Sequence, residues 1–237
     1  MPIFAHLALS TGPVFHLAAL AAETRSRAGA DSLEWQVLRY ARLAGHAYPR
    51  RGPAWSPQHA AFQLDYFAET FDEALFASCS PATRETWLAA AGDASVPEFM
   101  SGLADLLRIA EREPSPGYAE VPLARWEAEA RYPRLCGGIW PFSTGDYESY
   151  EQAVTDVVES EHPWYCHEDL AELLAQSVEV IELSAVSPEF AESIAEFVPA
   201  HTRRALPDLA AASADHFRRA HVGEASARPP EWRPDRQ

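Results

Sequence analysis

The chain has 237 residues, of which 47% are hydrophobic, and it carries a formal net charge of −16. This length and apolar content are typical of a globular protein with a buried core and exclude a disordered chain. The sequence contains no lysine, which excludes Schiff-base enzymes, P-loop nucleotide-binding proteins and kinases that depend on one. Because asparagine is also absent while alanine and arginine are abundant, the composition indicates a GC-rich bacterial genome.

Acidic residues are concentrated in the second half of the chain. Between Arg134 and Arg203 lie 68 residues that contain 14 acidic side chains and no arginine or lysine. A surface of this sign repels phosphate groups, so we expect the protein to bind neither nucleic acid nor an anionic membrane directly.

The cysteines and the apolar segments bear on where the protein resides. Cys79, Cys136 and Cys166 are odd in number and lack a Cys-x-x-Cys spacing, which argues against a disulfide framework. Residues 3–22 are apolar, but they lack a preceding arginine or lysine and are interrupted by Pro13, so they make a poor signal peptide. Because no uncharged apolar stretch approaches 18 residues, we expect a soluble, cytoplasmic protein.

Helix start signals recur along the chain. Ser56-Pro57, Ser80-Pro81 and Ser187-Pro188 each place a capping hydroxyl before a proline at the first helical position. Asp31 with Glu34, and Ser95 with Glu98, have the spacing of a capping box. From these signals and the apolar periodicity we predict helices near 13–28, 32–46, 57–78, 81–91, 96–112, 122–132, 147–161, 167–183, 188–198 and 207–221.

These elements predict an all-α fold, an irregular bundle or stacked-pair array of about ten short helices. Residues 178–183 resemble a short strand, but the leucines that precede them follow the helical spacing better. We expect one helical domain over residues 1–221, with a possible subdivision at the irregular segment 133–146. Residues 222–237, rich in proline, arginine and small side chains, read as a disordered tail.

Three successive helices, at 147–161, 167–183 and 188–198, are expected to turn carboxylates away from their apolar stripes. The acidic face is defined as the eleven residues Glu148, Glu151, Asp156, Glu159, Asp169, Glu172, Glu179, Glu182, Glu189, Glu192 and Glu196. One interpretation is a docking surface for a basic protein partner. The others are a solvated face, or neutralisation by the C-terminal arginines 203, 204, 218 and 219.

The densest group of reactive side chains lies between residues 159 and 169. Glu159 and His162 have the Glu-x-x-His spacing of helical di-iron proteins, which however require two copies of that motif. His162, Cys166 and His167 are reasonable zinc ligands, although no Cys pair or His-x-x-x-His supports them. Glu159, His162, Cys166 and His167 are thus weak metal candidates, and a simple helix junction is the competing interpretation.

A second candidate site is the loop at 136–147. Its paired glycines would allow a ligand to approach the backbone closely. The side chains of Trp140 and Tyr147 are able to line a pocket. The loop and the 159–169 segment together supply the weak catalytic candidates, which are His162, Cys166, His167, Trp140 and Tyr147. The sequence contains none of the GxSxG, GxGxxG, HExxH or EF-hand motifs, so no common enzyme class is indicated.

Taken together, these features favour an acidic helical factor that binds a basic protein partner through its acidic face, as an inhibitor or immunity-like protein would. The alternative is a helical small-molecule enzyme with a pocket between the 136–147 loop and the 159–169 cluster. We expect no cofactor for either function.

Overall fold

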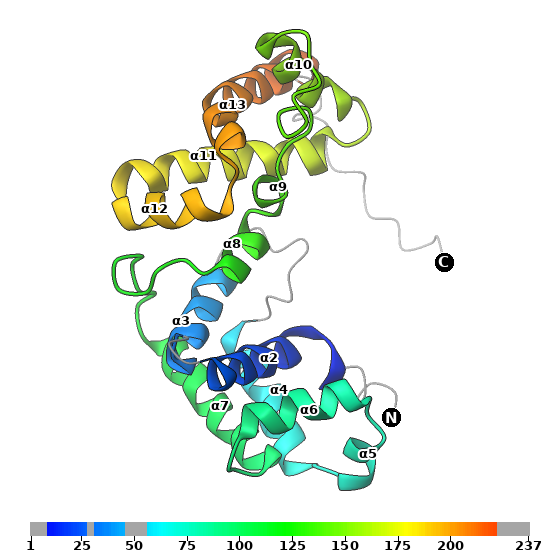
Figure 1. The fold of residues 1–237 in the computed structure, drawn as a ribbon, viewed down its shortest axis with the longest axis vertical. Coiled ribbons are helices and arrows are strands. Elements are labelled where there is room, and N and C mark those ends of the chain that lie inside the picture. Colours follow the sequence, from blue (N-terminus) through cyan, green and yellow to red (C-terminus); the bar gives the residue numbers. More distant parts are fainter. Residues whose placement is uncertain (1–8, 28–30, 46–55, 222–237) are drawn as a thin grey trace, which may run out of the picture. The chain divides into compact units, whose positions relative to one another are not determined.

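The computed structural model describes residues 9–27, 31–45 and 56–221, and these residues contain twelve α-helices, one π-helical turn and no strand (Figure 1). Ten of the helices have seven or more residues, so the prediction of an all-α fold with about ten helices is confirmed. The expected tail at 222–237 lies outside the described residues. No helix in the described part of the chain combines the length and the apolar character needed to cross a membrane.

The chain divides into two compact units, residues 1–131 and residues 132–237, with the boundary immediately before the irregular segment at 133–146. The first unit contains helices α2 (Gly12–Ser26), α3 (Leu33–Ala44), α4 (Pro57–Glu69), α5 (Glu73–Ala77), α6 (Pro81–Ala91), α7 (Val96–Arg112) and α8 (Arg125–Arg131). Helix α4 packs against α7, and α2 packs against α6. Trp87, Leu64 and Leu103 lie at the centre of the core that these helices share.

Local capping explains where most of these helices begin. Ser56 and Ser80 accept hydrogen bonds from the backbone N–H groups of His59 (3.3 Å) and Thr83 (3.1 Å), as predicted. Ser95 and Glu98 form the complete capping box expected at the start of α7. The other expected capping box is wrong, since Ser32 rather than Asp31 caps α3.

The single helix expected over 57–78 is two helices. The chain leaves α4 at Thr70, and the Asp72 carboxylate then accepts the N–H groups of Ala74 (2.8 Å) and Leu75 (3.0 Å) to begin α5. Aspartate favours this cap because its short side chain competes for backbone N–H groups. A local capping signal therefore outweighs the continuous apolar pattern of this segment.

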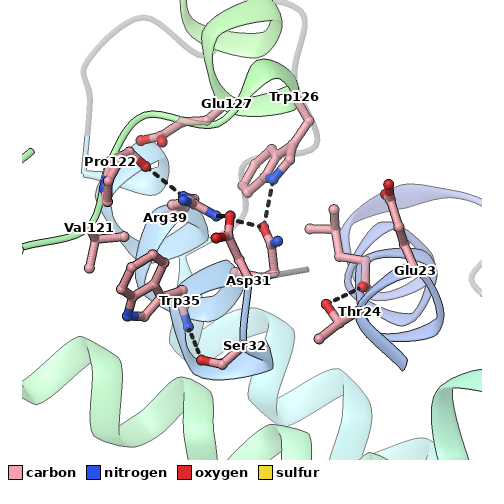
Figure 2. A network of polar contacts seen from close by, with 12 residues as sticks. Glu23, Thr24, Asp31, Ser32, Trp35, Arg39, Val121, Pro122, Trp126 and Glu127 are labelled. Carbon is pink, nitrogen blue, oxygen red and sulfur yellow. Dashed lines mark hydrogen bonds and ion pairs between the residues drawn. The ribbon is translucent and has the colours of Figure 1, made fainter. Parts of the chain in front are cut away.

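A polar network in the first unit joins the buried arginines of α3 to the segment that leads into α8 (Figure 2). Arg39 pairs with Asp31 (2.5 Å) and donates from Nε to the carbonyl oxygen of Pro122 (2.8 Å). One turn later, Arg42 contacts both carboxylate oxygens of Glu127, with Nε–Oε1 at 2.7 Å and Nη2–Oε2 at 2.8 Å. Because Glu127 is fully buried, this paired geometry is required to keep the charge inside.

The second unit contains α9 (Pro133–Cys136), α10 (Tyr150–Ser160), the π-helical turn η1 (Cys166–Leu170), α11 (Ala171–Val186), α12 (Pro188–Phe197) and α13 (Ala200–Ala220). The residues that resemble a short strand at 178–183 lie inside α11. Helix α13 packs against both α10 and α11, and Leu206 and Leu209 on α13 are buried.

Helix α13 begins seven residues earlier than the predicted start at residue 207. The prediction placed Pro207 at the first helical position, where proline is most common. In the structure Pro207 lies inside the helix, and the preceding turn buries Ala205 and Leu206. Burial of that apolar face outweighs the loss of one backbone hydrogen bond at the proline. The longer helix therefore packs along both α10 and α11 before it ends at His221.

Candidate metal centre

Four side chains of the second unit converge on one point. The donor atoms of His162, Cys166, His216 and His221 all lie within 4.8 Å of one another. Thiolate and imidazole are the ligands that zinc prefers in proteins, and four of them complete a tetrahedral shell. These four residues are hereafter called the His/Cys cluster.

Two separate parts of the chain supply the cluster. Helix α10 ends at Ser160, and the following turn places His162 beside the start of η1, where Cys166 is the first residue. His216 lies in the C-terminal part of α13, and His221 is the residue at which that helix ends. Because α10 and α11 both pack against α13, their adjoining ends bring the two halves of the cluster together.

Cys166 is the first residue of a π-helical turn, a rare backbone conformation. The backbone N–H groups of Asp169 and Leu170 both donate hydrogen bonds to the carbonyl oxygen of Tyr165, at 2.7 and 3.4 Å. The longer hydrogen bond, from Leu170, spans five residues. This π-helical turn leads directly into α11. Single π-turns within helices are often found at functional sites.

The separations within the cluster match a tetrahedral metal site. Cys166 Sγ lies 3.4 Å from His216 Nε2 and 3.6 Å from His162 Nδ1. Zinc bonds of ordinary length to sulfur and nitrogen, at a tetrahedral angle, hold the two atoms about 3.5 Å apart. The three histidine rings also contact one another, with centroid separations of 5.0 Å for His162–His216, 5.4 Å for His216–His221 and 5.7 Å for His162–His221.

Three of the four residues of the cluster are buried. Cys166 is fully buried, and His216 and His221 are 3% and 7% exposed, whereas His162 reaches the surface. Burial of several imidazole groups around a thiol is costly unless their polar atoms find partners. A bound cation would supply one shared partner for all four donors.

One carboxylate stands directly behind the cluster. Glu159, in the last turn of α10, places Oε1 3.4 Å from Nδ1 of His216, while Nε2 of the same ring faces Cys166. An imidazole that contacts a carboxylate through one nitrogen and a metal through the other is a recurring arrangement in metalloproteins.

The structure brings together three of the four metal candidates predicted from the sequence. His162 and Cys166 are in the cluster, and Glu159 contacts it through His216. His167 is exposed, and its ring lies against the ring of His221 (4.8 Å) outside the four converging donors. Sequence reasoning missed His216 and His221, whose only signal was a pair of histidines at the end of the last predicted helix.

The catalytic candidates in the 136–147 loop lie elsewhere. Trp140 lines a cavity of about 270 Å³ together with Arg134, Glu161, Asp169 and other residues of the second unit. Arg134 forms an ion pair with Asp169 inside this cavity. Tyr147 instead lines a separate, shallower hollow with Asp146, Glu148 and Gln152. The cavity that Trp140 lines lies between the 136–147 loop and the 159–169 segment, where the alternative function placed its pocket, but Tyr147, His162 and His167 are not among its lining residues.

None of the eleven residues of the acidic face is buried. Of these, Asp169 pairs with Arg134, and Glu159 contacts His216. Three of the arginines of α13 make contacts within or next to their own helix. Arg218 and Arg219 pair with Asp215, and Arg203 donates to the carbonyl oxygen of Val198.

Comparison of the chain with protein-family models, with curated proteins and with solved structures finds no match.

Proposed function

We propose that the second unit binds a zinc ion through His162, Cys166, His216 and His221. The observation that carries this proposal is the convergence of four donor atoms within 4.8 Å, with nitrogen–sulfur separations of 3.4 and 3.6 Å. One thiolate and three imidazoles form a donor set that suits zinc, whose structural sites are four-coordinate and tetrahedral.

The number of ligands favours a structural role for the metal. Catalytic zinc sites keep one position open for water or substrate, whereas a cluster that supplies four protein ligands fills the tetrahedral shell. The ion would cross-link the turn after α10 and the start of η1 to the C-terminal end of α13, parts of the chain 50 positions apart. Binding of this kind contributes directly to the free energy of folding.

Metal content measured on the purified full-length chain tests the proposal. After exhaustive dialysis, elemental analysis of the wild type is expected to give one zinc per chain. Cys166→Ser should lose this zinc, while Cys136→Ser should retain it, because Cys136 lies in α9 outside the cluster. A wild-type chain that holds no zinc when refolded with excess metal would overturn the proposal.

We propose, as a second and separable function, that the acidic face docks a basic protein. Support comes from the position of these carboxylates at the surface, together with the pairing of Arg218 and Arg219 to Asp215 on their own helix. A surface with this excess of negative charge accelerates association with a basic partner and selects against acidic ones.

Affinity capture from the native host at low and at high salt tests this second function. The wild type should retain a stoichiometric basic protein that dissociates at high salt. A variant with Glu172, Glu179 and Glu192 replaced by arginine should lose it while keeping its helical circular dichroism. If the variant captures the same protein as efficiently as the wild type, the acidic face is not the docking surface.

A further inference from the structure

Glu159 lies partly at the surface of the second unit, yet it contacts a buried histidine of the His/Cys cluster. Its side chain is 53% exposed, yet Oε1 lies 3.4 Å from Nδ1 of His216, which is itself almost fully buried. The carboxylate thus stands between solvent and a ring that belongs to the His/Cys cluster.

The two nitrogens of His216 face different partners. Nε2 lies 3.4 Å from Cys166 Sγ and is therefore the atom directed at the metal position. A metal-binding imidazole is neutral and offers a lone pair from one nitrogen, so its remaining proton resides on the other. Metal binding through Nε2 would therefore leave the proton of His216 on Nδ1, 3.4 Å from the Glu159 carboxylate oxygen that is able to accept it.

Neighbouring carboxylates in the second unit have other partners. Glu161 and Asp169 pair with Arg134, and Asp215 pairs with Arg218 and Arg219. The contact from Glu159, in contrast, joins a carboxylate to a histidine of the cluster.

We infer that Glu159 is a positioning residue of the metal centre, which fixes the tautomer and orientation of His216 and thereby strengthens zinc binding. This inference rests on the proposed zinc-binding function. Glu159 does not touch the metal position itself but acts through His216. Outer-shell partners of this kind typically change metal affinity by roughly 10- to 100-fold when removed.

Two variants and a matched control separate the role of the carboxylate from a general effect of charge. Glu159→Ala removes the acceptor, and Glu159→Gln retains a neutral one. Glu151→Ala removes an exposed carboxylate from the first turn of the same helix, α10. Competition with a chromophoric chelator should give zinc affinities in the order wild type, Glu159→Gln, Glu159→Ala. The last should be weaker by roughly 10- to 100-fold, with Glu151→Ala equal to the wild type.

A second readout reports on His216 without any metal. In the metal-free protein, long-range proton–nitrogen NMR correlations of the ring distinguish a proton on Nδ1 from one on Nε2. The wild type is expected to show the Nδ1–H form, and Glu159→Ala is expected to shift His216 toward the Nε2–H form. A merely structural contribution of Glu159 would leave this tautomer unchanged.

The outcomes distinguish this inference from the function on which it rests. A wild-type chain that binds no zinc overturns both. Zinc binding of equal affinity in the wild type and Glu159→Ala overturns the role of Glu159 alone. An Nε2–H tautomer of His216 in the metal-free wild type also overturns that role alone, because the proton would then occupy the proposed ligand atom.

Discussion

The Nε2 atom of His216 lies 3.4 Å from the Sγ atom of Cys166, although 50 positions separate the two residues in the sequence. One is presented by the π-helical turn η1 and the other by the C-terminal part of α13. Their approach, completed by His162 and His221, makes the ends of α10, η1 and α13 the most chemically distinctive part of the molecule.

Removal of the proposed zinc ion is expected to destabilise the second unit. A chelator should lower the thermal unfolding midpoint of the wild type, because the ion would bind the folded state and not the unfolded chain. His216→Gln should reproduce the effect and make the protein insensitive to chelator. His201→Gln, an exposed site in the first turn of α13, should leave the response to chelator unchanged. Equal midpoints with and without chelator would contradict this prediction.

Loss of the buried carboxylate of Glu127 is expected to be severe. Glu127→Ala would leave the charge of Arg42 buried without its partner, and breaking such a pair costs about 3–5 kcal/mol of unfolding free energy. Glu129→Ala removes a partner of Arg125 at the surface, and this loss should lower the unfolding free energy by about 1 kcal/mol or less. Urea unfolding of both variants compares the two costs, and similar values would contradict the importance of the buried pair.

Acid is expected to destabilise the first unit through His16. Burial lowers the pKa of His16 below its ordinary value. The unfolded chain therefore takes up a proton near pH 6.5 that the folded chain does not, and stability falls as the pH drops below about 6.5. His16→Gln should reduce this fall when urea unfolding is measured from about pH 7 to about pH 5, a range that brackets the ordinary histidine pKa. His59→Gln, at an exposed position of α4, is the control, and an effect equal to that of His16→Gln would refute the explanation.

Tyr150 is expected to resist ionisation. Partial desolvation of the exposed ring, and then the hydrogen bond from its hydroxyl to Asp208 (2.7 Å), raise the pKa of Tyr150 to about 12. The neutral form is therefore favoured in the folded state, and the stability that it contributes is present below about pH 10 and lost as the pH rises toward 12. In a spectrophotometric titration, Tyr150→Phe should remove the signal of a tyrosine that ionises only at a pH well above the ordinary tyrosine pKa. If Tyr150→Phe removes a transition near the ordinary tyrosine pKa, the pairing with Asp208 does not act as described.

Local signals in the sequence predicted a large part of the fold. The prolines after Ser80 and Ser187 mark the true starts of α6 and α12, and the helix predicted at 96–112 agrees with α7 at both ends. These features are encoded within a few residues, since a cap and its N–H partners are close neighbours along the chain.

The errors have both local and non-local causes. The early start of α13 follows from burial of Leu206, whereas the break between α4 and α5 follows a local cap at Asp72 that competes with an apolar pattern. The sequence indicated half of the His/Cys cluster, because His162 and Cys166 are near neighbours in the chain. His216 and His221 join them only through the packing of α13 against α10 and α11.

Titration of the metal-free chain with Co²⁺ tests the proposed metal centre most directly, because cobalt absorption reports both the geometry of the site and its sulfur ligand. We predict saturation at one Co²⁺ per chain, with the intense visible bands of a tetrahedral ion and a sulfur-to-cobalt charge-transfer band that Cys166→Ser abolishes and Cys136→Ser retains. Weak octahedral bands, or a charge-transfer band that survives in Cys166→Ser, would contradict a metal centre built on His162, Cys166, His216 and His221.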